Sequence, residues 1–241
     1  MRNIVSIGIW LGSIILTVLL FVVVLLLTLV LFPFDKNKRI THAQCFWWAN
    51  AVIALDPYWN MQVKGLENID RRKVYVVIAN HQSLADIVVL YKTKMQFKWV
   101  AKESLFNVPF VGWCLGLIKH INLRRGNYAS IKQVYHEAAA WLRKDMSVLF
   151  FPEGTRSDTG QMNDFQNGAF KLAIKEKKPV LPICIEGTRE VIPKGNWVFG
   201  EKVLVKITVL PAIQTENFGS ADFAKLRDLV RTKISGCLPP V

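Results

Sequence analysis

Residues 3–34 form an unbroken stretch of 32 residues without a single Lys, Arg, Asp, Glu or His. As one helix this stretch would be roughly 48 Å long, whereas the hydrocarbon core of a bilayer is about 30 Å thick. It is too long for the core of a signal peptide, and no small-residue cleavage site follows it. We therefore predict a retained membrane anchor. It is either one tilted span or two short segments that enter one leaflet, hinged at Gly12, Ser13 and Thr17.

The rest of the chain is basic and of ordinary polarity. All 18 acidic residues and 30 of the 31 basic residues of the 241-residue chain follow position 34, which gives this part a net charge of +12. Its length suits one α/β domain. The division of the chain into one uncharged stretch and one body of ordinary polarity excludes a disordered chain, a collagen-like repeat and a polytopic channel. We predict membrane-anchoring helices over residues 1–60 and an α/β domain over 61–241.

The positive charge and the cysteines indicate the surroundings of this domain. Lys36, Lys38 and Arg39 follow the anchor at once, and the positive-inside rule therefore predicts that the domain is cytoplasmic. Beside a membrane anchor, the charge favours acidic substrates or anionic lipid as partners, and not nucleic acid. The four cysteines form no Cys-x-x-Cys pair, which favours reduced core thiols.

Apolar runs alternate with amphipathic segments along the domain. The strands that we expect lie at 74–79, 97–101, 147–151, 180–185 and 203–210. The helices that we expect lie at 41–57, after Asp86, at 128–144, at 168–177, and near the C-terminus after a cap at Ser220. Strands that alternate with helices predict an α/β domain with a mostly parallel sheet flanked by helices. In such sheets functional groups collect in the loops after the strands.

A histidine and an aspartate lie close together in the polar turn after the strand expected at 74–79. His81 and Asp86 are followed by an apolar run of helical pattern. An acid at this spacing can hold one ring nitrogen of the histidine and leave the other as an acceptor, as a general base requires. The alternative is a structural histidine beside an acid that favours the helix N-terminus. No Ser or Cys stands in a Gly-x-Ser-x-Gly setting, so a catalytic pair would activate a substrate hydroxyl or water.

The second polar loop follows the strand expected at 147–151 and reads Phe-Pro-Glu-Gly-Thr-Arg-Ser over 151–157. Gly154 permits close backbone approach, Thr155 and Arg156 supply donors, and a guanidinium matches phosphate oxygens in a bidentate fork. The alternative is a surface turn with a solvated arginine. Three more basic residues are candidates for phosphate contact: Lys102, Arg124 and Arg125.

Together, Asn80-His81-x-x-x-x-Asp86 and the 151–157 block resemble the motifs of the glycerolipid acyltransferase family. The bacterial 1-acyl-sn-glycerol-3-phosphate (lysophosphatidic acid) acyltransferases resemble it best, and the resemblance covers roughly residues 60–215. It implies a glycerol-3-phosphate acyltransferase-like fold at the cytoplasmic side of a bacterial inner membrane. The implied reaction moves a fatty acyl group from acyl-CoA or acyl-carrier protein to the free sn-2 hydroxyl of lysophosphatidic acid, giving phosphatidic acid without a metal or cofactor. Membrane lipids are the further implied partners.

The resemblance also implies roles for single residues. His81 is the expected general base and Asp86 its orienting partner. Pro182, central in an apolar strand, is the expected contact for the acyl donor. The residues expected to bind the acceptor's phosphate are Lys102, Arg125, Glu153, Gly154, Thr155 and Arg156.

Two departures from the family pattern bear on these roles. The family's Gly-x-x-Phe-Ile-Asp-Arg is Lys-His-Ile-Asn-Leu-Arg-Arg over 119–125, so either Arg124 or Arg125 fills the phosphate role, and we favour Arg125. The family's Phe-Lys-x-Gly is Phe-Gln-Asn-Gly over 165–168, which removes one positive charge.

Other functions compatible with the sequence are an acyltransferase for glycerol 3-phosphate or another lyso-lipid, and a non-catalytic basic protein of the membrane surface. A metal-assisted phosphohydrolase is disfavoured because the four histidines lack the spacing of metal ligands. The sequence leaves open the acyl-chain length, the choice between CoA and carrier protein, and the oligomeric state.

Overall fold

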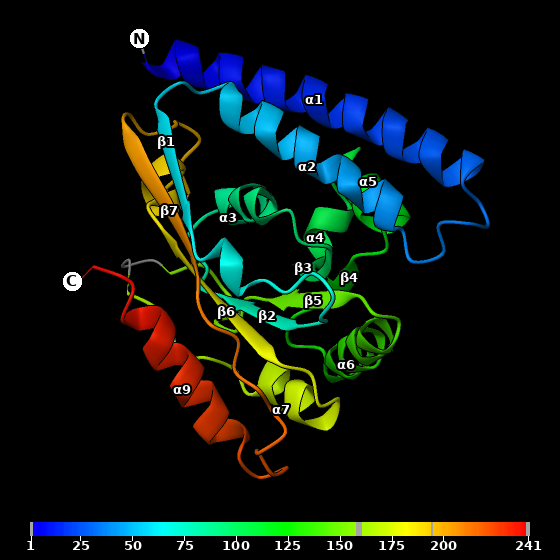
Figure 1. Cartoon of the computed structure of the whole chain (residues 1–241). Coiled ribbons are helices and arrows are strands. Elements are labelled where there is room, and N and C mark those ends of the chain that lie inside the picture. Colours follow the sequence, from blue (N-terminus) through cyan, green and yellow to red (C-terminus); the bar gives the residue numbers. More distant parts are fainter. Residues whose placement is uncertain (1, 158–160, 194, 240–241) are drawn as a thin grey trace.

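The computed structural model describes residues 2–157, 161–193 and 195–239, and it is built on a seven-stranded sheet with helices on both faces (Figure 1). The strands are β1 (Trp59–Lys64), β2 (Val76–Ala79), β3 (Phe97–Lys102), β4 (Ile121–Leu123), β5 (Ser147–Phe150), β6 (Val180–Glu186) and β7 (Val203–Val209). Their order in the sheet is β1-β7-β6-β2-β5-β3-β4. All neighbours are parallel except β6 and β7. The predicted α/β class with a mostly parallel sheet is confirmed.

The central strands are apolar because helices cover both of their faces. Every residue of β2 is buried, as are the first six residues of β6, and this is why continuous apolar runs predict both strands. The edge strand β1 alternates between half-buried and exposed residues. Neither β1 nor β4 was predicted. β1 pairs with β7, far along the chain, with Trp59 opposite Val203. No local turn joins the two strands, so the local sequence does not predict their pairing.

Helices cover both faces of the sheet. They are α1 (Arg2–Val30), α2 (Arg39–Ala54), α3 (Ala85–Leu90), α4 (Glu103–Phe106), α5 (Val111–Leu117), α6 (Tyr128–Arg143), α7 (Gly168–Lys175), α8 (Thr188–Val191) and α9 (Phe223–Ser235), with 3-10 turns η1 (Leu66–Asn68) and η2 (Tyr91–Thr93). Figure 1 shows α6, α7 and α9 on one face and α1 to α5 over the other. A separate apolar core fills each of the two interfaces.

The ends of two helices differ in how they are capped. The Asn127 side chain accepts the N–H of Ser130 at 2.9 Å and begins α6. The predicted cap of the last helix, Ser220, is wrong. Asp222 stands at that position, and its carboxylate accepts the N–H of Gly219 at 2.7 Å in the preceding turn.

The N-terminal apolar stretch forms one continuous helix, α1, which is long and apolar enough to cross a membrane. The alternative of two short segments hinged at Gly12, Ser13 and Thr17 is therefore wrong. Gly12 instead gives room to Leu55 just after α2, because a Cβ at Gly12 would lie 3.0 Å from the Leu55 methyl carbons. Thr17 Oγ1 donates to the Ser13 carbonyl at 2.7 Å inside the helix.

The first turns of α1 are fastened to the α/β body. The Arg2 guanidinium pairs with the Asp56 carboxylate at 2.7 Å. Ser6 Oγ accepts the N–H of Phe199 at 3.0 Å, and Trp10 Nε1 donates to the Trp197 carbonyl at 2.8 Å. Further along, α1 packs against α2 and α5. The predicted anchor is therefore docked along one layer of the body.

The outer face of α1 is apolar along its whole length. Its exposed residues recur every three or four positions, which puts them on one side of the helix. They are Ile4, Ile7, Leu11, Ile14, Ile15, Leu19, Val22, Leu26, Leu29 and Val30. An exposed apolar surface of this size marks a site of contact with a membrane or another protein.

Two buried histidines, His42 of α2 and His120, lie with their rings 5.7 Å apart between centroids. The ring of His42 lies 5.4–5.7 Å from the rings of Phe46, Tyr91, Phe97 and His120. Burial lowers the pKa of His42 to about 3 and lowers the pKa of His120 well below its ordinary value. Both rings are therefore neutral in the folded protein, whereas the unfolded chain protonates them below about pH 6.5.

We expect the free energy of unfolding to fall as the pH is lowered from about 6.5 toward the His42 pKa of about 3. In this window the unfolded chain binds more protons than the folded chain, so each buried histidine removes about 1.4 kcal/mol per pH unit. His42→Phe should make the loss between about pH 7 and 5 shallower, measured from unfolding of the detergent-solubilised protein. The control is the same change at the exposed His136 of α6, which should keep the native slope. An unaltered slope in His42→Phe would contradict this account.

Candidate active site

The two polar loops singled out in the sequence meet at one edge of the sheet. β2 and β5 are parallel neighbours, so the loops that follow them leave the sheet side by side. The N–H of His81 donates to Glu153 Oε1 at 2.7 Å, and the N–H of Ser157 donates to the His81 carbonyl at 3.1 Å. The structure thus brings together the two motifs, as expected from their positions after strands.

His81 and Asp86 are in direct contact, with 2.7 Å between His81 Nδ1 and Asp86 Oδ2. The Asp86 carboxylate is fully buried, whereas 19% of the His81 side chain is exposed. Asp86 Oδ2 also accepts the N–H groups of Gln82 at 2.7 Å and Ser83 at 3.0 Å. A carboxylate that serves as an acceptor requires the proton on Nδ1, so Nε2 of His81 is left with a lone pair. The ring is held flat against Phe151, with 4.3 Å between centroids.

A threonine that the sequence analysis did not identify completes the surroundings of Asp86. Thr188 Oγ1 donates to Asp86 Oδ1 at 2.5 Å from the first residue of α8. The turn that delivers it needs Gly187, whose φ is +86° and whose Cβ would lie 2.1 Å from the Leu204 carbonyl. The only local signal is a Gly-Thr pair directly after an apolar strand, and it does not indicate which acid the threonine meets.

Glu153 holds the two loops together. Its Oε1 accepts the N–H of His81, and its Oε2 accepts the N–H of Asn163 at 2.8 Å. Burial raises the pKa of Glu153 above its ordinary value, and the two N–H donors oppose that rise. Gly154 follows with a φ of +70°. Its own N–H donates to the Phe151 carbonyl at 3.1 Å and is therefore engaged in the turn.

The expected phosphate ligands differ in where they lie. Partial burial, together with the charge of the Arg156 guanidinium nearby, lowers the pKa of Arg125. Arg124 instead lies 3.7 Å from the Glu103 carboxylate. Thr155 is exposed at the surface of the loop.

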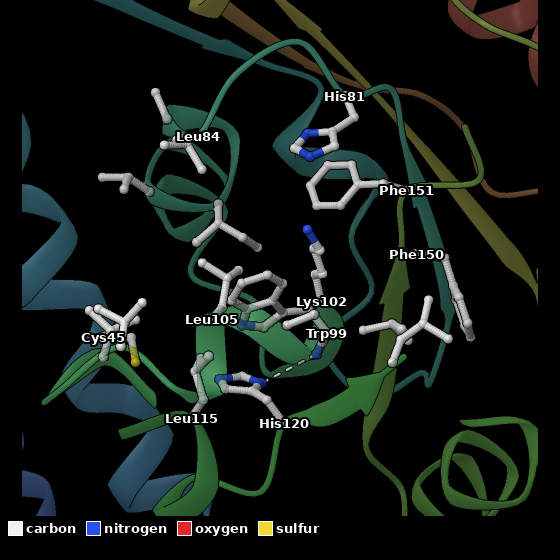
Figure 2. A pocket seen from close by; sticks show the side chains of 18 of the residues that line it. Cys45, His81, Leu84, Trp99, Lys102, Leu105, Leu115, His120, Phe150 and Phe151 are labelled. Carbon is white, nitrogen blue, oxygen red and sulfur yellow. Dashed lines mark hydrogen bonds between the residues drawn. The ribbon is translucent and has the colours of Figure 1, made fainter. Parts of the chain in front are cut away.

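A cavity of about 880 Å³ opens beside this loop pair and extends between the sheet and the helices over it. Figure 2 shows His81 and Phe151 at one end, with the Lys102 side chain extending toward them, and Leu115 and His120 at the other end. The wall between the ends is mainly apolar and includes residues of α1, α2 and α3: Ile14, Leu20, Trp48, Val52, Ile87 and Val88. The polar residues of its rim are Lys102, Arg125, Gln166, Asn167 and Lys171.

Pro182 is apart from the cavity. It lies in β6 opposite Ile78 of β2, is buried in the sheet, and its carbonyl accepts the N–H of Leu210 at 2.9 Å. It is not among the residues that line the cavity.

No group of three His, Cys, Asp or Glu side chains suited to a metal ion occurs in the described part of the chain.

Comparison with known proteins gives one consistent result. The sequence model of the acyltransferase family matches residues 60–186. A 1-acyl-sn-glycerol-3-phosphate acyltransferase of Chlamydomonas reinhardtii is 34% identical over 95% of this chain and 68% of its own length. The enzyme of that name from Pseudomonas aeruginosa is 33% identical over 78% of this chain and 71% of its own. The crystal structure of the lysophosphatidic acid acyltransferase PlsC from Thermotoga maritima aligns with a TM-score of 0.84 at 26% identity, covering 98% of this chain and 95% of that one.

The Glu153 contacts predict a specific loss of stability. Glu153→Gln keeps the shape of the side chain but replaces one acceptor oxygen with a donor, so one of the two N–H groups loses its partner. We expect a loss of about 1–3 kcal/mol in the free energy of unfolding, measured by denaturant titration in detergent. Glu67→Gln, at an exposed carboxylate of η1, is the matched control and should be neutral. Equal stability of the two variants would contradict a stabilising role for the two hydrogen bonds that Glu153 accepts.

Proposed function

This chain belongs to the acyltransferase family, and from that premise we propose that it acylates the free sn-2 hydroxyl of 1-acyl-sn-glycerol-3-phosphate to give phosphatidic acid. The donor is an acyl thioester of CoA or acyl-carrier protein. The observation that carries the proposal is the contact between His81 and the buried Asp86 at the mouth of a large apolar cavity with a basic rim. Relatives that match most of the chain are named for this reaction.

The proposed chemical step needs no enzyme nucleophile. His81 Nε2 takes the proton of the acceptor hydroxyl as its oxygen attacks the thioester carbonyl, and the thiol of the donor leaves with a proton. Asp86 keeps the Nδ1 proton in place and stabilises the imidazolium that forms. Thr188 and the N–H groups of Gln82 and Ser83 fix the carboxylate, and we assign them positioning roles.

The acceptor's phosphate is proposed to bind at the basic rim. Arg156 lies near enough to Arg125 for their charges to interact, and two guanidinium groups suit a dianion. Lys102 extends toward the same end of the cavity (Figure 2). Gly154 leaves room there, since a Cβ at that position would meet nothing within 4 Å. Glu153 acts indirectly in this proposal, by holding the His81 loop, because both of its oxygens already accept N–H groups.

The long apolar part of the cavity is proposed to hold an acyl chain. Each methylene removed from water contributes about 0.8 kcal/mol, so an apolar cavity of about 880 Å³ favours a long chain. α1 and α2 supply part of its wall, and the apolar outer face of α1 is proposed to rest in one leaflet. A lyso-lipid would then reach the site without leaving the membrane surface. The basic residues after α1 support a location at the cytoplasmic side of a bacterial inner membrane.

The deciding assay uses the purified protein with labelled acyl-CoA and acyl-carrier protein donors and a panel of acceptors. We expect acylation of 1-acyl-sn-glycerol-3-phosphate, and His81→Ala should lower kcat by at least about 100-fold because the general base is lost. His136→Ala, at an exposed histidine of α6, should keep the native rate. A His81→Ala variant that keeps more than a few per cent of the rate would refute the base assignment. Preferred acylation of glycerol 3-phosphate or a lyso-lipid without phosphate would refute the acceptor.

Arg125 and Arg124, which are consecutive in the sequence, provide a test variant and its matched control for the phosphate site. Arg125→Gln should raise the KM for the phosphorylated acceptor about tenfold or more, because a charged hydrogen bond to phosphate contributes about 1.5–3 kcal/mol. Arg124→Gln should leave this KM within about twofold, since Arg124 lies beside Glu103 at 3.7 Å and an exposed ion pair contributes about 0–1 kcal/mol. The opposite ranking of the two variants would assign the phosphate to Arg124.

A further inference from the structure

The cavity reaches both faces of the sheet around the end of β5. Phe151 packs with the core that includes residues of α1, α2 and α5, whereas Phe150 packs with the core that includes residues of α6, α7 and α9. Figure 2 shows the two side chains on opposite sides of the β5 ribbon, as expected for consecutive residues of an extended chain. Both line the cavity. The cavity therefore has a second branch on the α6 and α7 face, apart from the long apolar branch.

The α6 side of the second branch combines an aliphatic wall with a hydroxyl group. Ile131 and Val134 form the wall. The Tyr135 hydroxyl lies against α7, because a Cβ at Gly168 would be 1.6 Å from Tyr135 Oη. This hydroxyl has no hydrogen-bond partner among residues 2–157, 161–193 and 195–239. Burial raises the pKa of Tyr135, so the hydroxyl keeps its proton and can donate it to a ligand.

The α7 side of the second branch carries an amide and a positive charge. The N–H of Lys171 donates to the Asn167 carbonyl at 3.1 Å, so the two side chains lie on one face of the helix. Arg227 of α9 donates to Asn167 Oδ1 at 2.7 Å, which leaves the NH₂ group of Asn167 as a donor. Lys171 Nζ lies 4.3 Å from the centre of the Phe223 ring and forms no ion pair within the described part of the chain. Its charge can therefore serve an anionic ligand.

The two branches face different surroundings. α1 lies on the opposite face of the sheet from α6 and α7 (Figure 1), and the outer face of α1 is the one proposed to rest in the membrane. The second branch opens at Ile131, which is 38% exposed, and at the exposed Lys171. A water-soluble substrate can thus reach the end of β5 from the side away from α1.

We propose that the second branch binds the phosphopantetheine arm of the acyl donor, with Lys171 at its phosphate. The inference rests on the proposed function, because it takes the donor to be an acyl thioester. A pantetheine arm alternates amide and hydroxyl groups with methylene and methyl groups, and this suits the donors of Tyr135 and Asn167 beside an aliphatic wall. The thioester end then lies at His81, and the acyl chain continues into the apolar branch. CoA and acyl-carrier protein carry the same arm, so the subsite serves either source.

The test uses palmitoyl thioesters whose thiol part is shortened in steps: palmitoyl-CoA, palmitoyl-phosphopantetheine and palmitoyl-pantetheine. The acceptor is 1-acyl-sn-glycerol-3-phosphate at one fixed concentration, with the full chain in detergent. We expect kcat/KM to fall about tenfold or more between the phosphopantetheine and pantetheine donors, because a hydrogen bond to a charged group is lost. Palmitoyl-acyl-carrier protein, assayed beside palmitoyl-CoA, shows which source of the arm the enzyme uses.

Lys171→Gln should remove this discrimination, so that the phosphopantetheine and pantetheine donors react with nearly equal kcat/KM. The matched control is Lys175→Gln, one turn further along α7 and outside the cavity lining, which should keep the native ratio. Each ratio compares two donors on one protein sample, so partial unfolding of a variant cancels. Tyr135→Phe should raise the KM for palmitoyl-CoA about threefold, the effect of one neutral hydrogen bond, and leave the KM for the acceptor unchanged.

The outcomes separate this proposal from the one on which it rests. A native ratio in Lys171→Gln overturns the subsite and leaves the acyltransferase intact. A Lys171→Gln loss with palmitoyl-CoA but not with palmitoyl-phosphopantetheine assigns Lys171 to the nucleotide phosphates and also overturns it. So does a raised KM for the acceptor with an unchanged donor series, which would put Lys171 at the acceptor's phosphate. Absence of acyl transfer from every donor overturns the proposed function itself.

Discussion

The carboxylate of Asp86 has no exposure to solvent, and the structure of the site follows from what such a group needs. A buried carboxylate is tolerated only when donors surround it. Asp86 receives them from the His81 ring, from two N–H groups of its own turn, and from the hydroxyl of Thr188 after β6. Satisfying one carboxylate therefore joins the loops after two adjacent strands and orients the histidine. Glu153 ties the loop after β5 to the same histidine through its backbone N–H.

The apolar helix α1 and the cavity are built together. α1 is fastened through Arg2, Ser6 and Trp10 to the segment that follows α8, where Arg2 donates to the Phe199 carbonyl, and α8 supplies Thr188 to the site. The inward face of α1 lines the cavity while its outward face exposes aliphatic side chains. The inward face is apolar because it lines the cavity. The outward face is apolar as expected for contact with a membrane or another protein. This accounts for a 32-residue stretch without one charge, which neither a soluble core helix nor a single bilayer crossing demands.

The sequence was informative where the physical cause of a feature is local. The central strands are buried on both faces, and their continuous apolar runs predicted them; His81 and Asp86 share one turn, and their spacing predicted the pair. It was uninformative where the cause lies far along the chain. The Thr188–Asp86 bond joins distant segments, and β1 is held in the sheet by its pairing with β7. Glu153 accepts a backbone N–H of the His81 loop, a contact that no side-chain pattern reveals. The composition of α1 also did not show that the helix is continuous. Gly12 is compatible with a hinge in the sequence, but in the structure it gives room to Leu55.

The two ends of the cavity show how one residue type takes opposite roles. At His81 the Nδ1 atom faces a carboxylate, which can only accept, so the outward Nε2 has a lone pair. At His120 the Nδ1 atom faces a backbone N–H, which can only donate, so the inward Nε2 is a donor. In each case the partner of Nδ1 decides whether Nε2 carries a lone pair or a proton. The side chain of His81 is partly exposed, whereas the ring of His120 is buried and stays neutral.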